Sequence, residues 1–205
     1  MVDPFLLAAF VPAALALNLT PGADMMFCVG QGLRRGPAAA WAASAGISLG
    51  GMIHVLLAGL GLGALIAAVP WSFEVIRWIG VIYLLYLAFQ MLRSRGQDAD
   101  LPAIGNARRA FVNGMLVNLT NPKVILFVLA FVPQFVTPGT PAEVLAQFLL
   151  FGAVLGVGGF VVNGMAGVLA ARAGRRMTGG GAALRWISST IFLGLALRLA
   201  VMERT

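Results

Sequence analysis

Long runs without a charged residue constrain this chain more than any other feature of its sequence. Residues 41–68 and 144–171 contain no Asp, Glu, Lys or Arg, and residues 5–17 are equally free of charge. About 20 consecutive apolar residues are enough for a helix to cross the hydrocarbon core of a bilayer. Charged residues make up 10% of the chain, against about 25% in soluble domains. We therefore expect an all-α integral membrane protein whose residues 1–205 form a single transmembrane domain.

The apolar runs predict six transmembrane helices, separated by polar or Gly- and Pro-rich turns. The expected ranges are 5–33, 41–68, 73–92, 110–136, 144–171 and 186–201. The most polar segment, residues 94–109, is expected to be a cytoplasmic linker. It would divide the chain into two halves, residues 1–93 and 110–205.

A polar, helix-breaking segment interrupts the first apolar run. It reads Asn18-Leu19-Thr20-Pro21-Gly22-Ala23-Asp24, and Pro21 removes a backbone N–H from the helix. Lipid cannot satisfy the backbone groups that such a break frees, so they must face protein or a water-filled cavity. About a hundred residues later the fourth helix contains Asn118-Leu119-Thr120-Asn121-Pro122-Lys123. The second break carries the basic residue Lys123, whereas the first carries the acidic residue Asp24.

The arginines orient the chain in the membrane. Most of them lie in the loops after the first, third and fifth helices: Arg34, Arg35, Arg93, Arg95, Arg108, Arg109, Arg172, Arg175, Arg176 and Arg185. Cytoplasmic loops carry the excess of basic residues, so these loops are expected inside and both termini outside. The two broken helices then cross in opposite directions. This predicts two inverted three-helix repeats with a site near the membrane centre, an architecture common in secondary transporters.

Asp24 and Lys123 are the leading candidates for a functional role, because ionisable residues at membrane depth are costly. In one interpretation they pair permanently and pin the two halves together. In the other, which we favour, Asp24 faces a cavity, binds a substrate ammonium group and takes up a proton during the transport cycle. Lys123, the only lysine, would bind a carboxylate or hold Asp24 between substrate visits. Half-helices that begin at Gly22 and Pro122 present N–H groups that can also hold a carboxylate.

Uncharged polar residues complete the predicted site. The expected substrate-binding residues are Asn18, Thr20, Pro21, Gly22, Asp24, Asn118, Asn121, Pro122 and Lys123. For the amides and hydroxyls among them, capping of the broken backbone is a compatible role. His54, the sole histidine, is favoured as a hydrogen-bonded packing residue and kept with Asp24 as a proton-coupling candidate. Tyr83, Tyr86 and Asn163 are expected to line a cavity.

Several other classes of function are disfavoured by what the chain contains. One histidine and one cysteine give little basis for a soft-metal site, and we expect no metal or other cofactor. No Ser/His/Asp arrangement or phosphate loop suggests an enzyme. The net charge of +7 follows from the oriented loops and does not indicate a nucleic-acid partner. The ridges Gly46/Gly50, Gly59/Gly63 and Gly152/Gly156 predict close helix packing and permit a homodimer.

Four separated blocks occur in an order that is specific to one family. They are Pro21-Gly22-Ala23-Asp24 followed by Gly32-Leu33-Arg34-Arg35-Gly36, then residues 82–88, residues 114–123 and residues 127–135. Over nearly its whole length the chain resembles the LysE-type amino-acid exporters, in particular their homoserine/threonine-exporter branch. Members of that branch commonly read Asn-Pro-Gly-Pro at the first break, whereas here Thr20 precedes Pro21-Gly22 and Ala23 follows them.

The resemblance implies a multi-pass carrier of the bacterial inner membrane that exports amino acids or related zwitterions, by exchange for protons. With the inverted halves, this leads us to expect alternating access, with the amino acid, protons and membrane lipid as the chain's partners. Two alternatives stay open. A cation exporter of the same fold would need several oxygen ligands around Asp24. A membrane scaffold that transports nothing would use Asp24 and Lys123 only to pin helices.

Overall fold

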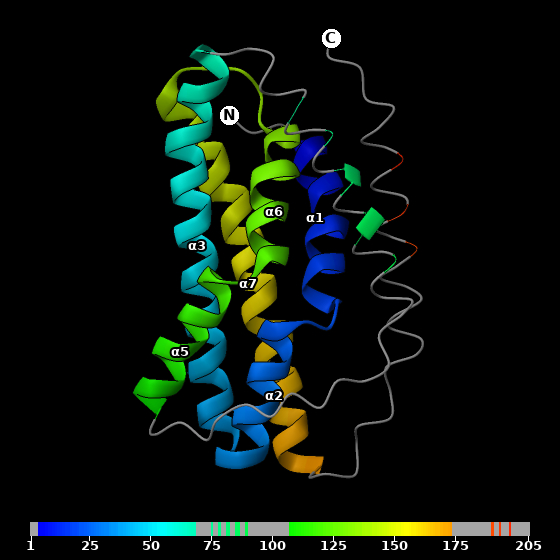
Figure 1. The fold of residues 1–205 in the computed structure, drawn as a ribbon, viewed down its shortest axis with the longest axis vertical. Coiled ribbons are helices and arrows are strands. Elements are labelled where there is room, and N and C mark those ends of the chain that lie inside the picture. The colour runs from blue at the N-terminus through cyan, green and yellow to red at the C-terminus, as the bar shows by residue number, and fades with distance from the viewer. Residues whose placement is uncertain are drawn as a thin grey trace.

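The computed structural model of the chain describes residues 4–68 and 107–173, together with isolated helical positions between 75 and 89 and between 190 and 197. Throughout these residues the regular structure is helical (Figure 1). Most residues of the predicted helices at 73–92 and 186–201 lie outside the described residues, as does the linker before residue 107. The described part nevertheless agrees with an integral membrane protein built from apolar helices.

The elements follow the chain as α1 (Pro4–Leu19), α2 (Ala23–Arg35), α3 (Pro37–Ala68), α5 (Ala107–Leu119), α6 (Pro122–Ala130), the 3₁₀ turn η1 (Val132–Phe135) and α7 (Pro141–Ala173). In the part of the chain that the structure describes, two helices, α3 and α7, are long and apolar enough to cross a membrane. The pair α1 and α2 bends by 53°, and the pair α5 with α6 and η1 bends by 56°. Both bends fall at the breaks expected from the sequence.

The two bent pairs run in opposite directions beside the two long helices. In Figure 1, α3 and α7 extend over the full height of the bundle, whereas α1 and α6 lie in its upper half and α2 and α5 in its lower half. The first pair therefore descends from α1 to α2, and the second ascends from α5 to α6. Both breaks lie near mid-height.

Three predicted helix starts were wrong by three or four residues. The structure has only Gly36 between α2 and α3, where the predicted helix ranges left residues 34–40, and α3 begins at Pro37 instead of residue 41. Gly36 adopts a φ of 84°, which glycine tolerates and which turns the chain sharply. Proline is favoured as the first residue of a helix, because the N–H it lacks would have no helical partner there.

The start of α7 has the same physical basis. This helix begins at Pro141 instead of residue 144, and Thr140 precedes it. The backbone N–H and the hydroxyl of Thr140 donate to Glu143 Oε2 at 2.8 and 2.9 Å, as in a capping box. The third case is α5, which begins at Ala107 and so includes three residues that had been assigned to the linker.

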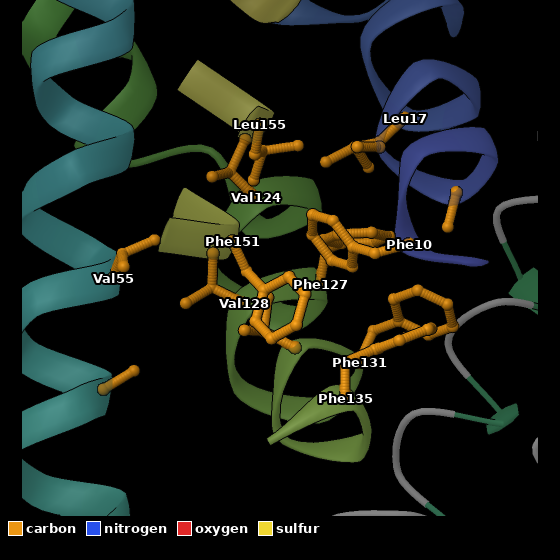
Figure 2. Packing of buried hydrophobic residues seen from close by; sticks show 14 of the residues in the cluster. Phe10, Leu17, Val55, Val124, Phe127, Val128, Phe131, Phe135, Phe151 and Leu155 are labelled. Carbon is orange, nitrogen blue, oxygen red and sulfur yellow. The ribbon is translucent and has the colours of Figure 1, made fainter. Parts of the chain in front are cut away.

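Phenylalanine rings fill the bundle between α1, α6 and α7 (Figure 2). The ring of Phe10 is fully buried. Its centroid lies 4.9 Å from that of Phe151, 5.2 Å from Phe135 and 6.4 Å from Phe127. These are ordinary distances for offset or edge-to-face aromatic pairs. We call this group, together with Phe131, the phenylalanine cluster.

A second buried cluster lies between α2, α3 and α5 and consists of smaller side chains. It contains Phe27, Cys28, Ala39, Ala43, Ile47 and Ala110. Helix α2 also approaches α7 closely, since a Cβ atom added at Gly32 would meet the backbone carbonyl of Gly167. Small residues permit such close approach in membrane helix packing. The two breaks lie between this cluster and the phenylalanine cluster.

Candidate functional site

The two breaks are built differently, although their sequences are similar. At the second break Asn121 is the N-cap of α6, and its side-chain oxygen accepts a hydrogen bond from the backbone N–H of Lys123 at 3.0 Å. Pro122 follows as the first helical residue. At the first break Gly22 is the N-cap of α2 and provides no side-chain acceptor. The first turn of α2 therefore begins without the side-chain cap that α6 has.

Lys123 reaches from the second break to the first. Its Nζ donates to the backbone oxygens of Leu17 at 3.1 Å and Thr20 at 3.0 Å. These carbonyls lie at the C-terminal end of α1, where a cation interacts favourably with the helix dipole. The contact with the first break is close, since a Cβ atom at Gly22 would lie only 3.3 Å from Nζ. Lys123 thus acts as a C-terminal cap for a helix of the other half.

Asp24 is buried in the first turn of α2, with 6% of its surface exposed. Its Oδ2 accepts a hydrogen bond of 2.8 Å from Asn118 Nδ2. Within the described residues, its other oxygen, Oδ1, has no hydrogen-bond partner, and neither has Oδ1 of Asn118. A buried acceptor left unsatisfied costs about 1–3 kcal/mol. The pair therefore presents two desolvated oxygens that a ligand with N–H donors would satisfy.

Asp24 and Lys123 do not form a direct ion pair in the described part of the chain. Asp24 bonds to Asn118, whereas Lys123 bonds to backbone carbonyls of α1. The interpretation of a permanent mutual pair therefore does not describe their contacts. Each residue instead joins one half of the chain to the other through a different partner.

A small cavity opens beside Asp24 where the two breaks meet the long helices. Its volume is about 30 Å³, enough for water but far below the roughly 300 Å³ of the smallest usual ligand pockets. It is lined by Leu17, Asn18, Asp24, Ile47, Ser48, Gly51, Asn118, Val124, Gly152, Leu155, Gly156, Gly159 and Asn163. The site is therefore closed in this structure, and an amino acid would enter only after helices move apart.

The structure brings four of the predicted polar residues to this cavity. Asn18, Asp24, Asn118 and Asn163 all line it, and Asn18 Nδ2 donates to the backbone oxygen of Leu155 in α7 at 3.1 Å. Asn163, expected as a cavity-lining residue, is buried there with 4% of its surface exposed.

Other predicted residues lie at the breaks but do not line the cavity. The hydroxyl of Thr20 donates to the carbonyl of Ala16 at 2.6 Å, which is a capping role. Pro21, Gly22, Asn121, Pro122 and Lys123 are likewise absent from the cavity walls.

The remaining candidates lie elsewhere. His54 Nε2 contacts the backbone oxygen of Asn118 at 3.3 Å, but the ring lines a separate groove. Tyr86 is 53% exposed and does not line the cavity. Tyr83 lies outside the described residues.

The long helices contribute cavity residues that sequence reasoning missed. Ser48 in α3 lines the cavity and donates to the backbone oxygen of Gly156 at 3.0 Å, and Ser44, one turn earlier, donates to that of Phe160 at 2.7 Å. Gly152 and Gly156 had been interpreted only as a packing ridge, yet both form cavity wall. The available signal in the sequence was the pair Ser44 and Ser48 on one helix, together with the glycine ridge on another. Within the described residues, no three His, Cys, Asp or Glu side chains gather as a metal site would require.

Comparison with known proteins gives a consistent family result. The sequence model of the family described as LysE type translocator matches residues 15–203. A homoserine/homoserine lactone efflux protein of Salmonella typhimurium is 36% identical over 147 residues, which cover 70% of either chain. A leucine efflux protein of Salmonella choleraesuis is 30% identical over 145 residues, 69% of this chain and 68% of that protein.

A third relative matches nearly end to end. It is a membrane protein of Vibrio cholerae, 30% identical over 200 residues, which cover 95% of this chain and 96% of that protein. No solved structure matches the chain.

Proposed function

Because this chain belongs to the LysE type translocator family, we propose that it exports amino acids or related small zwitterions across the bacterial inner membrane in exchange for protons. The family and its efflux relatives are transporters and not enzymes. The named relatives act on homoserine, homoserine lactone and leucine, which share a primary amine. The rest of the proposal concerns how this chain's own residues would recognise and move such a molecule.

The observation that carries the proposal is the pair of unpartnered buried oxygens, Asp24 Oδ1 and Asn118 Oδ1. A primary ammonium group has three N–H donors and no acceptor. Placed in the cavity, it would bond to both oxygens and neutralise the carboxylate. Charge-assisted hydrogen bonds of this kind are the stronger class. The substrate's ammonium group is therefore assigned to Asp24 and Asn118.

The substrate's carboxylate is assigned to the start of α2. This turn has no side-chain cap at Gly22, and the N–H groups at a helix start favour an anion. Lys123 is assigned a positioning role in the closed form, because its ammonium group is already engaged by the carbonyls of Leu17 and Thr20. This assignment replaces the direct carboxylate contact that the sequence suggested for Lys123.

Asp24 is assigned the coupling step. When a proton reaches Asp24 from the outside, the carboxyl group becomes neutral and its attraction for the ammonium group falls, so the substrate is released. Return of Asp24 to the cytoplasmic side and loss of the proton there restores the binding form. Proton entry down its gradient would thus drive export.

Alternating access is proposed from the way the cavity is closed. Leu17, Val124 and Leu155, which belong to the same buried core as the phenylalanine cluster, line it toward α1, α6 and α7, and Ile47 of the second cluster lines it on the other side. The two bent pairs run in opposite directions, so a tilt of one pair against α3 and α7 would open one side as the other closes. This corresponds to the inverted-repeat design of many carriers.

The test is efflux of homoserine and leucine from proteoliposomes under an imposed pH gradient. Asp24→Asn keeps the shape and an acceptor for Asn118 but cannot take up a proton. We expect it to abolish pH-driven efflux and to weaken amine binding by about 100-fold, corresponding to roughly 3 kcal/mol for a buried charge pair that loses one member. Glu143→Gln, at an exposed carboxylate of α7, is the matched control and should leave transport unchanged. Undiminished pH-driven efflux in Asp24→Asn would remove Asp24 from the mechanism.

A further inference from the structure

A second hollow lies between α3 and α6, separate from the Asp24 cavity. Its volume is about 370 Å³, and it is lined by His54, Leu57, Ala58, Gly61, Ile125, Val128 and Leu129. We call it the α3–α6 groove. Every lining side chain except His54 is apolar. The volume lies within the range of about 300–1,000 Å³ that is usual for small-molecule pockets, unlike that of the cavity.

The groove continues the Asp24 cavity along one face of α3. Ile47 and Gly51 line the cavity, and His54, Ala58 and Gly61 line the groove. Their spacing of three and four residues places them on a single helix face. On α6, Val124 lines the cavity, and Ile125 and Val128, which follow it, line the groove. Both hollows therefore have α3 and α6 among their walls, and the groove lies farther along these two helices than the cavity does.

Asn118 stands between the two hollows. Its side chain donates to Asp24 and lines the cavity. Its backbone oxygen accepts from the N–H of Asn121 at 3.0 Å and lies 3.3 Å from Nε2 of His54, which lines the groove. A carbonyl can only accept, so the His54 ring donates through Nε2. Asn118 therefore separates the two hollows, and we call it the Asn118 partition. It lies in the last turn of α5, where the helix ends at the second break.

We propose that the α3–α6 groove is an outer subsite of the transport path, which receives the apolar side chain of an amino acid as it leaves the Asp24 cavity. The proposal rests on the proposed export function. In the orientation given by the arginines, α3 runs from the cytoplasm outward, so the groove lies on the outer side of the cavity. Displacement of the Asn118 partition would join a water-sized cavity to a space large enough for a substrate.

His54 favours substrate and water over lipid as the occupant. Among the described residues no protein group bonds to its second ring nitrogen, Nδ1. A polar nitrogen without a partner is costly against hydrocarbon and is tolerated where it lines a hydrated cavity. If a lipid acyl chain filled the groove, Nδ1 would remain without a hydrogen-bond partner. Water or substrate that enters the groove would supply one.

The experiment uses cysteine accessibility, because Cys28 is the only cysteine and is buried. In a Cys28→Ser parent, Gly61→Cys places a thiol in the groove, where a new Cβ meets nothing within 4 Å. Leu60→Cys is the matched control: Leu60 is adjacent, is 58% exposed and does not line the groove. The probe is a water-soluble, membrane-impermeant methanethiosulfonate carrying a quaternary ammonium group, added from outside to intact cells with and without leucine.

We expect the Gly61→Cys thiol to react at least about tenfold faster than that of Leu60→Cys, because a thiol in lipid is neither ionised nor reached by the reagent. Saturating leucine should slow the Gly61→Cys reaction. Equal rates would show that lipid fills the groove, and fast labelling without protection would show a hydrated hollow outside the transport path. Either result overturns the subsite. Leucine efflux by the native chain and by the Cys28→Ser parent is measured first, since its absence from the native chain would refute the export of leucine itself.

Filling the groove gives a second readout. Gly61→Leu should lower leucine efflux by on the order of tenfold relative to Gly61→Ala, a loss typical of a few apolar contacts in a specificity pocket. The smaller side chain of homoserine should be affected less. Equal efflux of both amino acids in Gly61→Leu and Gly61→Ala, at equal amounts of folded protein, would contradict the proposal.

Discussion

Truncation of Phe10 to alanine tests the packing that closes the cavity toward α1 and α6. In a soluble protein a buried Phe→Ala change costs about 3–5 kcal/mol, part of which is transfer of the ring from water. That part nearly vanishes in a membrane, because lipid tails are as apolar as the protein interior. What remains is the empty space, about 100 Å³ at about 24 cal/mol per Å³, or roughly 2.4 kcal/mol.

Lost ring contacts add to this figure. Phe10 lies within 6.5 Å, between ring centroids, of Phe127, Phe131, Phe135 and Phe151, and an aromatic pair contributes about 0.5–1.5 kcal/mol. The figure for the empty space already includes much of the lost contact with these four rings, so we add only the equivalent of one pair. We therefore expect Phe10→Ala to lower the free energy of unfolding by about 3–4 kcal/mol.

The assay is thermal unfolding of purified protein in one fixed detergent, and its control is Phe5→Ala on the same helix. Phe5 is 84% exposed, so its truncation opens little space and should cost less than about 1 kcal/mol. Phe10→Leu, which refills most of the volume, should fall between the two. If Phe10→Ala and Phe5→Ala destabilise equally, the rings do not close the bundle as described.

Two further predictions concern contacts across the bundle. Lys123→Met removes the donor that caps the carbonyls of Leu17 and Thr20, and should lower the free energy of unfolding by about 2 kcal/mol. Lys123→Gln keeps an N–H donor and should lower it less. A Lys123→Met variant as stable as the parent would refute the capping role. Gly32→Leu drives a side chain into the carbonyl of Gly167 and should leave no monodisperse protein in size-exclusion chromatography, whereas normal recovery of that variant would contradict the close approach of α2 and α7.

Much of this architecture could be predicted from the sequence because the strongest signals are local. Pro21 and Pro122 mark both breaks: Pro21 lies between α1 and α2, and Pro122 is the first residue of α6. Helix starts were harder, because proline can end one helix or begin the next. Pro37 and Pro141 each begin a helix. The cues in the sequence were Gly36 before Pro37, where the structure has a positive φ, and Thr140 three residues before Glu143.

The site was less predictable, because the partners of its residues depend on contacts across the bundle. Asn18 and Asn118 occupy equivalent places in the two motifs, yet one bonds to a carbonyl of α7 and the other to Asp24. Opposite charges at the breaks suggested an ion pair. Instead, the side chain of Lys123 extends to the end of α1, where carbonyls freed by the first break need a donor. No pattern along the chain specifies that choice.

The cap supplied by Lys123 has a consequence for how the protein is made. The carbonyls of Leu17 and Thr20 precede Lys123 in the chain by 106 and 103 residues. During synthesis the first bent pair therefore enters the membrane well before its own cap has been translated. Until then water, lipid headgroups or the insertion machinery must satisfy those carbonyls. Completion of the first half is thus a late step of biogenesis, and a chain truncated before residue 123 should remain immature and open to degradation.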